Sequence, residues 1–336
     1  MKILLSSHFF HPCIGGTEEV SRTLACEFVK AGHEVKVVTR TRQESVDDFP
    51  FGIIRRPSPQ QLIRLVRWCD VFFHNNISLQ TAWPLLFVRK PWVVAHHTWI
   101  VRTNGRSGLR DWIKQQAAKH ALNISVSKAV AKHIRAPSVI IGNPYRDQMF
   151  KRDANAVRER DLVFLGRLLR DKGADLLLDA LSMLKQKGIT PRLTIVGEGV
   201  ARESLQRQST RLGLDQQVDF TGIRTGEDLA ALLNTHKVMV IPSLSQETFG
   251  LVALEGIACG CVPIGAECGG LPDAIGPAGV TFPCGEIEPL ARAIEMLLGD
   301  EAALARYREA AQEHLRRHKT ATVAQKYLEV LERAAR

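Results

Sequence analysis

The sequence predicts an α/β protein made of two doubly wound domains that face each other across a central cleft. The chain has 336 residues, enough for about two domains of ordinary size. Short apolar runs alternate with amphipathic stretches, which is typical of parallel sheets covered on both faces by helices. A polar, charged stretch at residues 146–160 interrupts this alternation and indicates a linker between the two domains.

The N-terminal half begins with an apolar run at Lys2–Ser6, and a Gly-containing turn at Gly15-Gly16 follows it. Thr17-Glu18-Glu19 then opens an amphipathic helix that closes at Gly32, with acidic residues at its start and glycine at its end, as helix termini favour. Further strands are expected at Glu34–Thr39, Val71–His74, Trp92–Ala95, Asn123–Val126 and Val139–Ile141.

The alternation restarts after the linker. Strands are expected at Asp161–Leu165, Arg192–Val196, Val218–Phe220, Lys237–Ile241 and Cys261–Ile264, and helices at Asp175–Lys187, Ala201–Leu212, Leu251–Cys259 and throughout 287–336. We therefore expect an N-terminal domain over 1–145, a C-terminal domain over 150–315, and a last helix over 316–336 that packs back on the N-terminal domain. Ligands of such sheets bind at the carboxyl ends of the strands, so the cleft is the expected site.

The composition excludes several classes of protein. Hydrophobic residues make up 45% of the chain and charged residues 24%, unlike disordered, collagenous or small disulfide-stapled proteins. The longest apolar run, Trp83–Val88, is far shorter than the roughly 20 residues of a membrane helix, and no signal-peptide apolar region is present. We therefore expect a soluble, cytoplasmic protein.

The seven cysteines are expected to be reduced thiols. Four of them lie in the C-terminal domain with spacings unlike those of zinc ligands, which favours small buried thiols: Cys259, Cys261, Cys268 and Cys284. The histidines of the N-terminal half fall in separate strand-end loops, where polar substrate contact is more typical than metal binding. No metal site is expected.

The positive charge is concentrated in one half of the chain. The net charge is +10, but residues 1–150 carry 21 Lys and Arg against 10 Asp and Glu, whereas residues 151–336 carry 24 against 25. No nucleic-acid-binding signature accompanies this charge. Three explanations remain open: an anionic substrate, a membrane surface, or solubility alone.

Two segments of the C-terminal half have residues suited to phosphate and sugar. Arg167 follows a strand end and Lys172 lies five residues later, and both cations suit phosphate oxygens. Glu247 and Glu255 bracket the start of a helix, and carboxylates beside a phosphate are suited to accept hydrogen bonds from sugar hydroxyls. The helix N-terminus at Phe249-Gly250-Leu251 favours an anion. Taken singly, each segment could be a solvated turn or a surface acid pair.

Residues 161–275 resemble the donor-binding domain of retaining glycosyltransferases of family 4, the glycogen-synthase-like enzymes with the GT-B fold of two doubly wound Rossmann-like domains. The family's Gly-Arg…Lys-Gly, Glu-x7-Glu and Gly-Gly-x-Pro signatures match Gly166-Arg167…Lys172-Gly173, Glu247…Glu255 and Gly269-Gly270-Leu271-Pro272.

The N-terminal half matches the family more loosely. Gly15-Gly16 corresponds to its double-glycine loop, and His96, three residues before Trp99, to its His-Asp-x-Trp; Ser127 and Asn143 also fall at family positions. The departures are His97 in place of Asp, Thr248 in place of Pro or Gly, and Pro144 in place of Gly. The spacing to Trp99 favours His96 over His97 as the histidine that faces the donor sugar.

The resemblance implies a metal-independent, retaining hexosyltransferase that uses a UDP- or GDP-sugar and no cofactor. Its implied catalytic residues are His96, Glu247, Arg167 and Lys172, of which the two cations would neutralise the leaving diphosphate. Glu247 would hold the sugar and Glu255 the ribose. The implied donor-binding residues are Gly15, Gly16, Gly166, Arg167, Lys172, Gly197, Ile223, Arg224, Glu247, Thr248, Phe249, Gly250, Leu251 and Glu255.

The acceptor is expected on the basic N-terminal domain, where His74 and His97 are candidate contacts. Cations are interspersed with tryptophans after the His96 loop, at Trp99, Arg102, Arg106, Arg110, Trp112, Lys114 and Lys119. Such a surface suits anionic lipid, so we expect a lipid-linked or phosphorylated cell-envelope glycan such as lipopolysaccharide core, made at the inner face of the cytoplasmic membrane. A small soluble acceptor is the alternative. An epimerase or phosphorylase of the same fold, or a non-enzymatic nucleotide-sugar binder, is disfavoured.

Overall fold

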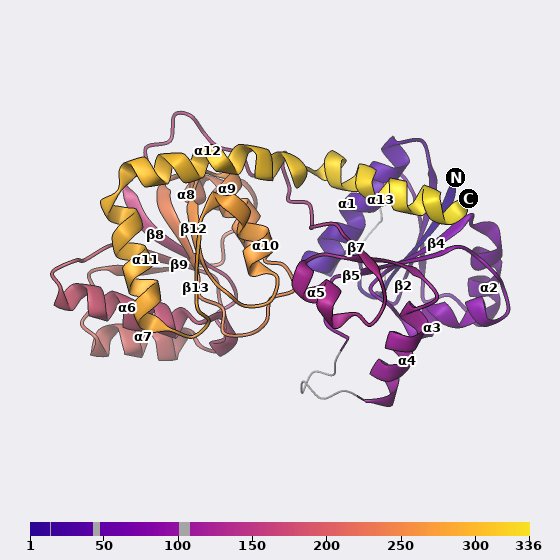
Figure 1. The fold of residues 1–336 in the computed structure, drawn as a ribbon, viewed down its shortest axis with the longest axis horizontal. Coiled ribbons are helices and arrows are strands. Elements are labelled where there is room, and N and C mark those ends of the chain that lie inside the picture. The colour runs from indigo at the N-terminus through magenta and orange to yellow at the C-terminus, as the bar shows by residue number, and fades with distance from the viewer. Residues whose placement is uncertain (14, 43–47, 101–107) are drawn as a thin grey trace. The chain divides into compact units, whose positions relative to one another are not determined.

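The computed structural model describes every residue except Ile14, residues 43–47 and residues 101–107. The chain divides into two compact units. Unit 1 comprises Met1–Pro144 together with Thr320–Arg336, and unit 2 comprises Tyr145–Lys319. In each unit the strands lie in the interior with helices around them (Figure 1).

Unit 1 is built on a seven-stranded parallel sheet with the strand order β3-β2-β1-β4-β5-β6-β7. Its strands are β1 (Lys2–Ser7), β2 (Glu34–Thr39), β3 (Gly52–Arg55), β4 (Val71–Asn75), β5 (Trp92–His96), β6 (Leu122–Ser125) and β7 (Ser138–Ile140). Its helices are α1 (Gly16–Lys30), α2 (Pro59–Trp68), α3 (Leu79–Ala82), the 3-10 helix η1 (Trp83–Leu86), α4 (Leu109–Ala118), α5 (Lys128–His133) and α13 (Thr320–Ala335).

Unit 2 is built on a six-stranded parallel sheet with the order β10-β9-β8-β11-β12-β13. Its strands are β8 (Arg160–Leu165), β9 (Leu193–Val196), β10 (Val218–Gly222), β11 (His236–Ile241), β12 (Val262–Ala266) and β13 (Val280–Phe282). Its helices are η2 (Arg170–Lys172), α6 (Ala174–Gln186), α7 (Arg202–Arg211), α8 (Gly226–Asn234), α9 (Leu251–Ala258), α10 (Leu271–Ile275), η3 (Gly276–Ala278), α11 (Ile287–Gly299) and α12 (Glu301–Arg317).

The central strands are apolar because helices cover both of their faces. Every residue of β4 and of β12 is buried, and in β1 only Lys2 is exposed. The end of the chain returns to unit 1, where α13 packs on α1, β4 and β5 and buries Tyr327 against Phe73 (Figure 1). No helix among the described residues has both the length and the apolar character that crossing a bilayer requires.

The expected linker at 146–160 is wrong for most of its length, because these residues belong to unit 2. Asp153 N donates a hydrogen bond to Asn234 Oδ1 over 2.8 Å, and Arg158 Nη1 donates to His236 O over 2.9 Å. Polar residues here satisfy backbone and side-chain groups at the edge of unit 2. A polar composition alone does not distinguish this use from solvation.

Several short elements were not expected from the sequence. They include β3, β13, α2, α3, α5, α8 and α10, most of which span fewer than ten residues. A local signal existed for α2, which begins after Ser58 with a complete capping box to Gln61 and has Pro59 in its first turn.

Candidate functional site

The carboxyl ends of β8 and β9 meet backbone to backbone. Gly166 N donates a hydrogen bond to Val196 O over 3.1 Å. Gly197 has a φ of +139°, and a Cβ at this position would collide with Gly166 O. The two glycine turns therefore hold Arg167 at this strand end, where its side chain is exposed and pairs with no carboxylate among the described residues.

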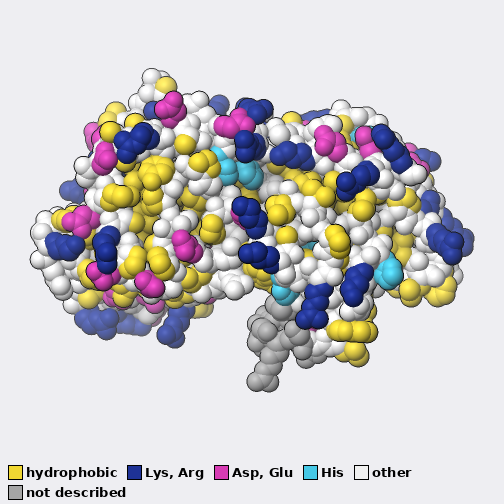
Figure 2. Space-filling view, in the orientation of Figure 1, with side chains coloured by type: hydrophobic (Ala, Val, Ile, Leu, Met, Phe, Trp, Pro, Cys, Tyr) yellow, Lys and Arg dark blue, Asp and Glu magenta, His cyan; other side chains and the backbone are white. Residues whose placement is uncertain are grey.

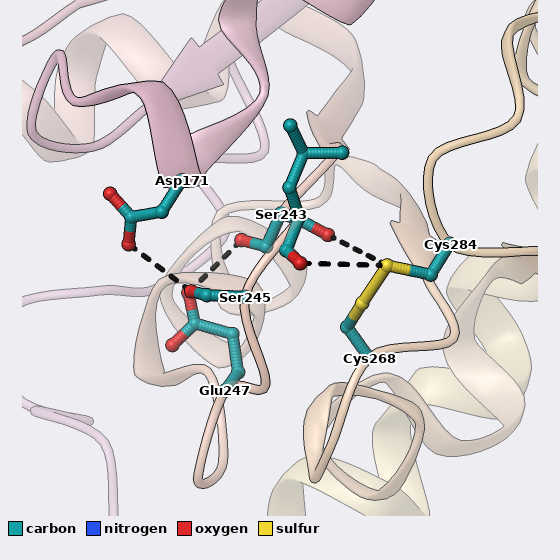
Figure 3. Close-up of a disulfide and its surroundings, with 7 residues drawn as sticks. Asp171, Ser243, Ser245, Glu247, Cys268 and Cys284 are labelled. Carbon is teal, nitrogen blue, oxygen red and sulfur yellow. Dashed lines mark hydrogen bonds between the residues drawn. A yellow bond between two sulfur atoms is a disulfide. The ribbon is translucent and has the colours of Figure 1, made fainter. Parts of the chain in front are cut away.

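The turn that carries Lys172 is fixed on the loop that follows β11. Gly173 has a φ of +70°, and a Cβ there would collide with Pro242 O. Leu244 N donates to Asp171 O over 2.8 Å, and Ser245 Oγ donates to Asp171 Oδ2 over 3.1 Å (Figure 3). Residues about 70 positions apart in the chain are thus held in one substructure.

Lys172 and Glu247 meet at this junction. Lys172 Nζ lies 2.5 Å from Glu247 Oε1. The same oxygen accepts a hydrogen bond from Ser243 Oγ over 3.0 Å, as Figure 3 shows. The Lys172 side chain is 21% exposed and that of Glu247 22%. The structure therefore pairs a cation that the sequence suggested for phosphate with a carboxylate that it suggested for sugar hydroxyls.

Glu255 lies in the second turn of α9 and has a partner that the sequence did not indicate. Arg146 Nη2 donates to Glu255 Oε1 over 3.2 Å, and the Arg146 guanidinium stacks 4.9 Å from the centroid of the Phe150 ring. The Glu255 side chain is 15% exposed. Because Arg146 belongs to the supposed linker, only the fold could identify it as part of this site.

The N-terminus of α9 completes the group. Thr248 is half-buried, and the amides of Phe249, Gly250 and Leu251 donate no hydrogen bond among the described residues. The Phe249 side chain is 2% exposed and packs on the His318 ring, so its side chain belongs to the interior. Such amides favour an anion.

Beyond the end of β10, Ile223 and Arg224 project into solvent. Ile223 is 67% exposed although it is apolar. Gly222 lies beside the Glu198 carboxylate, which is paired with Arg202 at the start of α7. The structure thus brings the turns after β8, β9 and β10 to one edge of the unit 2 sheet, as expected for neighbouring parallel strands.

The prediction of reduced thiols is wrong for Cys268 and Cys284, which form a disulfide (Figure 3). The two cysteines follow the adjacent parallel strands β12 and β13, whose carboxyl ends lie side by side; β13 was not expected from the sequence. The other five cysteines are free, and no group of three metal-ligating side chains occurs in the described part of the chain.

The disulfide lies against the loop that carries Glu247. Cys284 Sγ is 3.5 Å from Ser243 O and 3.9 Å from Leu244 O (Figure 3). Next to Cys268, Gly270 N donates to Glu247 O over 2.7 Å. The cross-link therefore fastens two loops to the segment that positions the Glu247 carboxylate.

Unit 1 contains a polar pocket of about 850 Å³ at the carboxyl ends of β1 and β4. It is lined by Ser7 and His8 after β1, by Asn75 and Asn76 after β4, and by the start of α1 and part of α4. Gly15 is the N-cap of α1 and Gly16 its first residue, and the Glu18 carboxylate lies over Gly15. Burial and the nearby charges of Arg40 and Lys114 lower the pKa of His8, which indicates a positive environment.

The prediction that His74 contacts the acceptor is wrong, because its side chain is completely buried. Trp92 Nε1 donates to His74 Nδ1 over 2.8 Å, so the ring proton is on Nε2, which donates to Thr81 Oγ1 over 2.9 Å. Burial lowers the pKa of His74 to about 3. His74 is a neutral residue of the interior.

His96 and His97 are both buried, and the choice of His96 as the histidine that faces the donor sugar stays a prediction. His96 is 1% exposed at the end of β5, and its Nε2 is 2.9 Å from Asn123 Oδ1. The ring nitrogens of His97 have no hydrogen bond of ordinary geometry among the described residues. Burial lowers the pKa of His96 to about 4 and that of His97 to about 3, the latter against an opposing effect of Asn143. His97 N also donates to Asn76 Oδ1, beside the polar pocket, over 2.7 Å.

Comparison with known families gives two matches that cover nearly the whole chain. A family model described as "Glycosyl transferases group 1" matches residues 145–314, and one described as "Glycosyltransferase Family 4" matches residues 14–143.

Curated relatives match mainly part of the chain. Glycogen synthase of Mycobacterium tuberculosis is 34% identical over 157 residues, which is 46% of this chain and 38% of that protein. A GDP-mannose-dependent alpha-(1-6)-phosphatidylinositol dimannoside mannosyltransferase of Mycobacterium tuberculosis is 41% identical over 115 residues, 34% of this chain and 29% of that protein. The chain thus spans about two fifths or less of the length of these relatives.

Solved structures match the chain over its full length. Anabaena Alr3699/HepE in complex with UDP superposes with a TM-score of 0.83 and 21% identity, covering 99% of this chain and 100% of that one. WaaG, described as a glycosyltransferase involved in lipopolysaccharide biosynthesis, superposes with a TM-score of 0.71 and 16% identity, covering 98% and 99%.

Proposed function

The chain belongs to the glycosyl transferases of group 1 and has the GT-B fold, and on this premise we propose that it transfers a hexose from a nucleoside diphosphate sugar to a saccharide acceptor. The observation that carries the proposal is the Lys172–Glu247 pair, which lies beside the unpaired amides of α9. A cation for phosphate and a carboxylate for sugar hydroxyls are thereby placed within one hydrogen bond of each other.

The donor binds to unit 2. Arg167 and Lys172 neutralise the diphosphate as it leaves, without a metal ion, and the α9 amides add hydrogen bonds to it. Gly15 and Gly16, at the N-terminus of α1, are the candidate donor contacts of unit 1. A UDP- or GDP-sugar is supported by the UDP bound in HepE and by the GDP-mannose dependence stated for the mannosyltransferase relative.

Glu247 holds the sugar and Glu255 the ribose, while the exposed Ile223 and Arg224 lie where the nucleobase stacks. Arg146 holds the Glu255 carboxylate in place through the 3.2 Å contact. The sugar is transferred with retention: the acceptor hydroxyl attacks the face that the diphosphate leaves, and a leaving phosphate oxygen takes its proton. His96 contacts the transferring sugar, and its neighbour His97 is the alternative.

The acceptor is a lipid-linked or phosphorylated cell-envelope glycan that binds to unit 1, and lipopolysaccharide core is one example. Support comes from the positive environment of His8 and from α4, where Arg110, Trp112 and Lys119 are exposed. Arg102 and Arg106 lie outside the described residues. The second candidate is a small soluble acceptor, which the polar lining of the unit 1 pocket would also suit.

A thermal-shift screen of nucleoside diphosphates tests the donor proposal, since a ligand at 100 times its dissociation constant stabilises the protein by about 2.7 kcal/mol. The nucleoside diphosphate that raises the melting temperature of the wild type should not raise that of Lys172→Ala. It should still raise that of Lys187→Ala, which removes an exposed lysine of the same unit. If no nucleoside diphosphate shifts the melting temperature of the wild type, the proposed function is wrong.

Co-sedimentation with anionic vesicles tests whether the protein binds an anionic membrane surface. Binding should weaken with salt and fall in Arg110→Glu and Lys119→Glu, at about 1 kcal/mol for each cation near the surface. Transfer to a neutral soluble acceptor by a protein that ignores such vesicles would instead support the second candidate.

A further inference from the structure

Unit 1 contains a second cavity, an apolar groove of about 720 Å³. The apolar side chains that line it come from α3 and η1, from the first residue of β5 and from α4: Leu79, Trp83, Leu86, Trp92, Ile113 and Ala117. Leu86 is 80% exposed and Ile113 37%. Large apolar side chains gathered around a concave surface indicate a binding site for an apolar group.

The groove adjoins the polar pocket of unit 1. Leu79 lines both cavities. Helix α4 also serves both, because Asp111 and Lys114 line the polar pocket, whereas Ile113 and Ala117 line the groove. A single ligand with a polar and an apolar part could therefore occupy the two cavities at once.

Buried hydrogen bonds hold the wall between the cavities. Thr81, in α3, accepts hydrogen bonds at Oγ1 from Ser6 Oγ over 2.8 Å and from His74 Nε2 over 2.9 Å. His74 in turn accepts from the indole N–H of Trp92, whose ring lines the groove. The groove wall is thus fastened to the sheet before any ligand arrives, which reduces the entropic cost of binding.

The charges around the groove are all positive. Arg89 and Lys90 line it, and none of its lining residues is acidic. Hydrophobic side chains and Lys or Arg side chains lie next to each other over α4 (Figure 2). An apolar channel with a cationic rim is complementary to a hydrocarbon chain that carries a phosphate.

We propose that the apolar groove binds the hydrocarbon chain of the acceptor, so that the acceptor is an anionic amphiphile whose saccharide occupies the polar pocket. This inference rests on the proposed function, in that unit 1 is taken to bind the acceptor. The segments that contact the hydrocarbon chain are α3, η1 and α4.

The test uses alkyl phosphates as probes, without donor or acceptor sugar. Isothermal titration of the full chain compares butyl phosphate with dodecyl phosphate, each below its critical micelle concentration. The longer chain should bind at least tenfold more tightly, because each methylene buried in the groove contributes hydrophobic free energy. Equal affinities for the two probes would overturn the proposal.

Two variants locate the binding. Leu86→Asp and Ile113→Asp should each remove most of the difference in affinity between dodecyl and butyl phosphate. A carboxylate in the groove repels the phosphate by its charge, and an alkyl chain that covers it would have to displace its hydration water. Met296→Asp is the matched control, since Met296 is 49% exposed on α11 of unit 2 and should leave binding unchanged. Dodecyl phosphate labelled with bromine should quench the fluorescence of wild-type protein more than that of Trp83→Phe.

The outcomes separate this inference from the proposed function. If nucleoside diphosphates bind but chain length has no effect, the groove proposal fails while the glycosyltransferase proposal stands. If chain length matters and no nucleoside diphosphate binds, the reverse holds. If the groove variants leave dodecyl phosphate binding intact but abolish binding of a protein partner, the groove is a protein-docking surface and the proposal is wrong.

Discussion

Removing the charge of Glu247 should strengthen the binding of free nucleoside diphosphate while it lowers turnover. Glu247 Oε1 lies 2.5 Å from Lys172 Nζ. A diphosphate that uses Lys172 must therefore compete with a carboxylate already in place. In Glu247→Gln the competition is gone, whereas the side-chain oxygen can still accept the hydrogen bond from Ser243 and keep the loop in its position.

The size of the effect follows from the exposure of the pair. Both side chains are about one-fifth exposed, so their ion pair is partly screened by water and contributes about 1 kcal/mol. Releasing Lys172 should therefore tighten nucleoside diphosphate binding about fivefold. Turnover should fall at least tenfold, because a charged acceptor of sugar hydroxyls is worth about 1.5–3 kcal/mol.

Isothermal titration with UDP and GDP measures the first effect, and product formation at saturating donor measures the second. Glu203→Gln is the matched control, since it removes a carboxylate that pairs with Arg207 over 3.5 Å on the exposed face of α7. The control should change neither quantity by more than twofold. Weaker nucleoside diphosphate binding by Glu247→Gln than by wild type would refute the reasoning.

Three further results are expected. Glu255→Ala should weaken nucleoside diphosphate binding itself, and Arg146→Ala should weaken it less; calorimetry with the opposite order would contradict the ribose assignment. Thiol titration in denaturant should find five reactive thiols before reduction and seven after it, and seven thiols without reductant would exclude the disulfide. Cys284→Ser should lower the free energy of unfolding by about 3 kcal/mol, because the disulfide closes a loop of 16 residues. Burial lowers the pKa of His74, His96 and His97 in the folded state. Between pH 7 and pH 5 the free energy of unfolding, measured in urea, should therefore fall by about 2 kcal/mol for each of these histidines, because the unfolded chain takes up protons there below about pH 6.5 and the folded chain does not. Equal free energies of unfolding at the two pH values would contradict their buried, neutral state.

Local sequence was sufficient for the fold class and for the groups in unit 2 suited to phosphate and sugar. Buried parallel strands require continuous apolar runs, and the strands of both sheets except β3 and β13 stand out for that reason. Arg167, Lys172 and Glu247 stand at strand ends or beside a helix start, where a parallel sheet places its ligand-binding groups. Their chemistry follows from their residue type. The glycines beside them are required because backbone segments approach each other closely there.

The partners of these side chains could not be obtained in this way. Only the fold pairs Lys172 with Glu247, directs Arg146 onto Glu255 and turns His96 toward Asn123, because each of these contacts depends on side-chain direction as well as on position. The spacing to Trp99 favours His96, and nothing in the sequence indicates that His96 and His97 are both buried. His97, one residue later, faces differently because successive side chains of an extended chain point to opposite sides.

The sequence by itself determined the two-sheet α/β architecture, the family resemblance and the one-sided charge, since each depends on local pattern or on composition. The tertiary structure alone decided the Cys268–Cys284 bond, the burial of His74 and the two cavities of unit 1. These features arise where segments distant in the chain are brought side by side by strand order and helix packing. Strand order is a property of the whole sheet, and no single segment of the sequence encodes it.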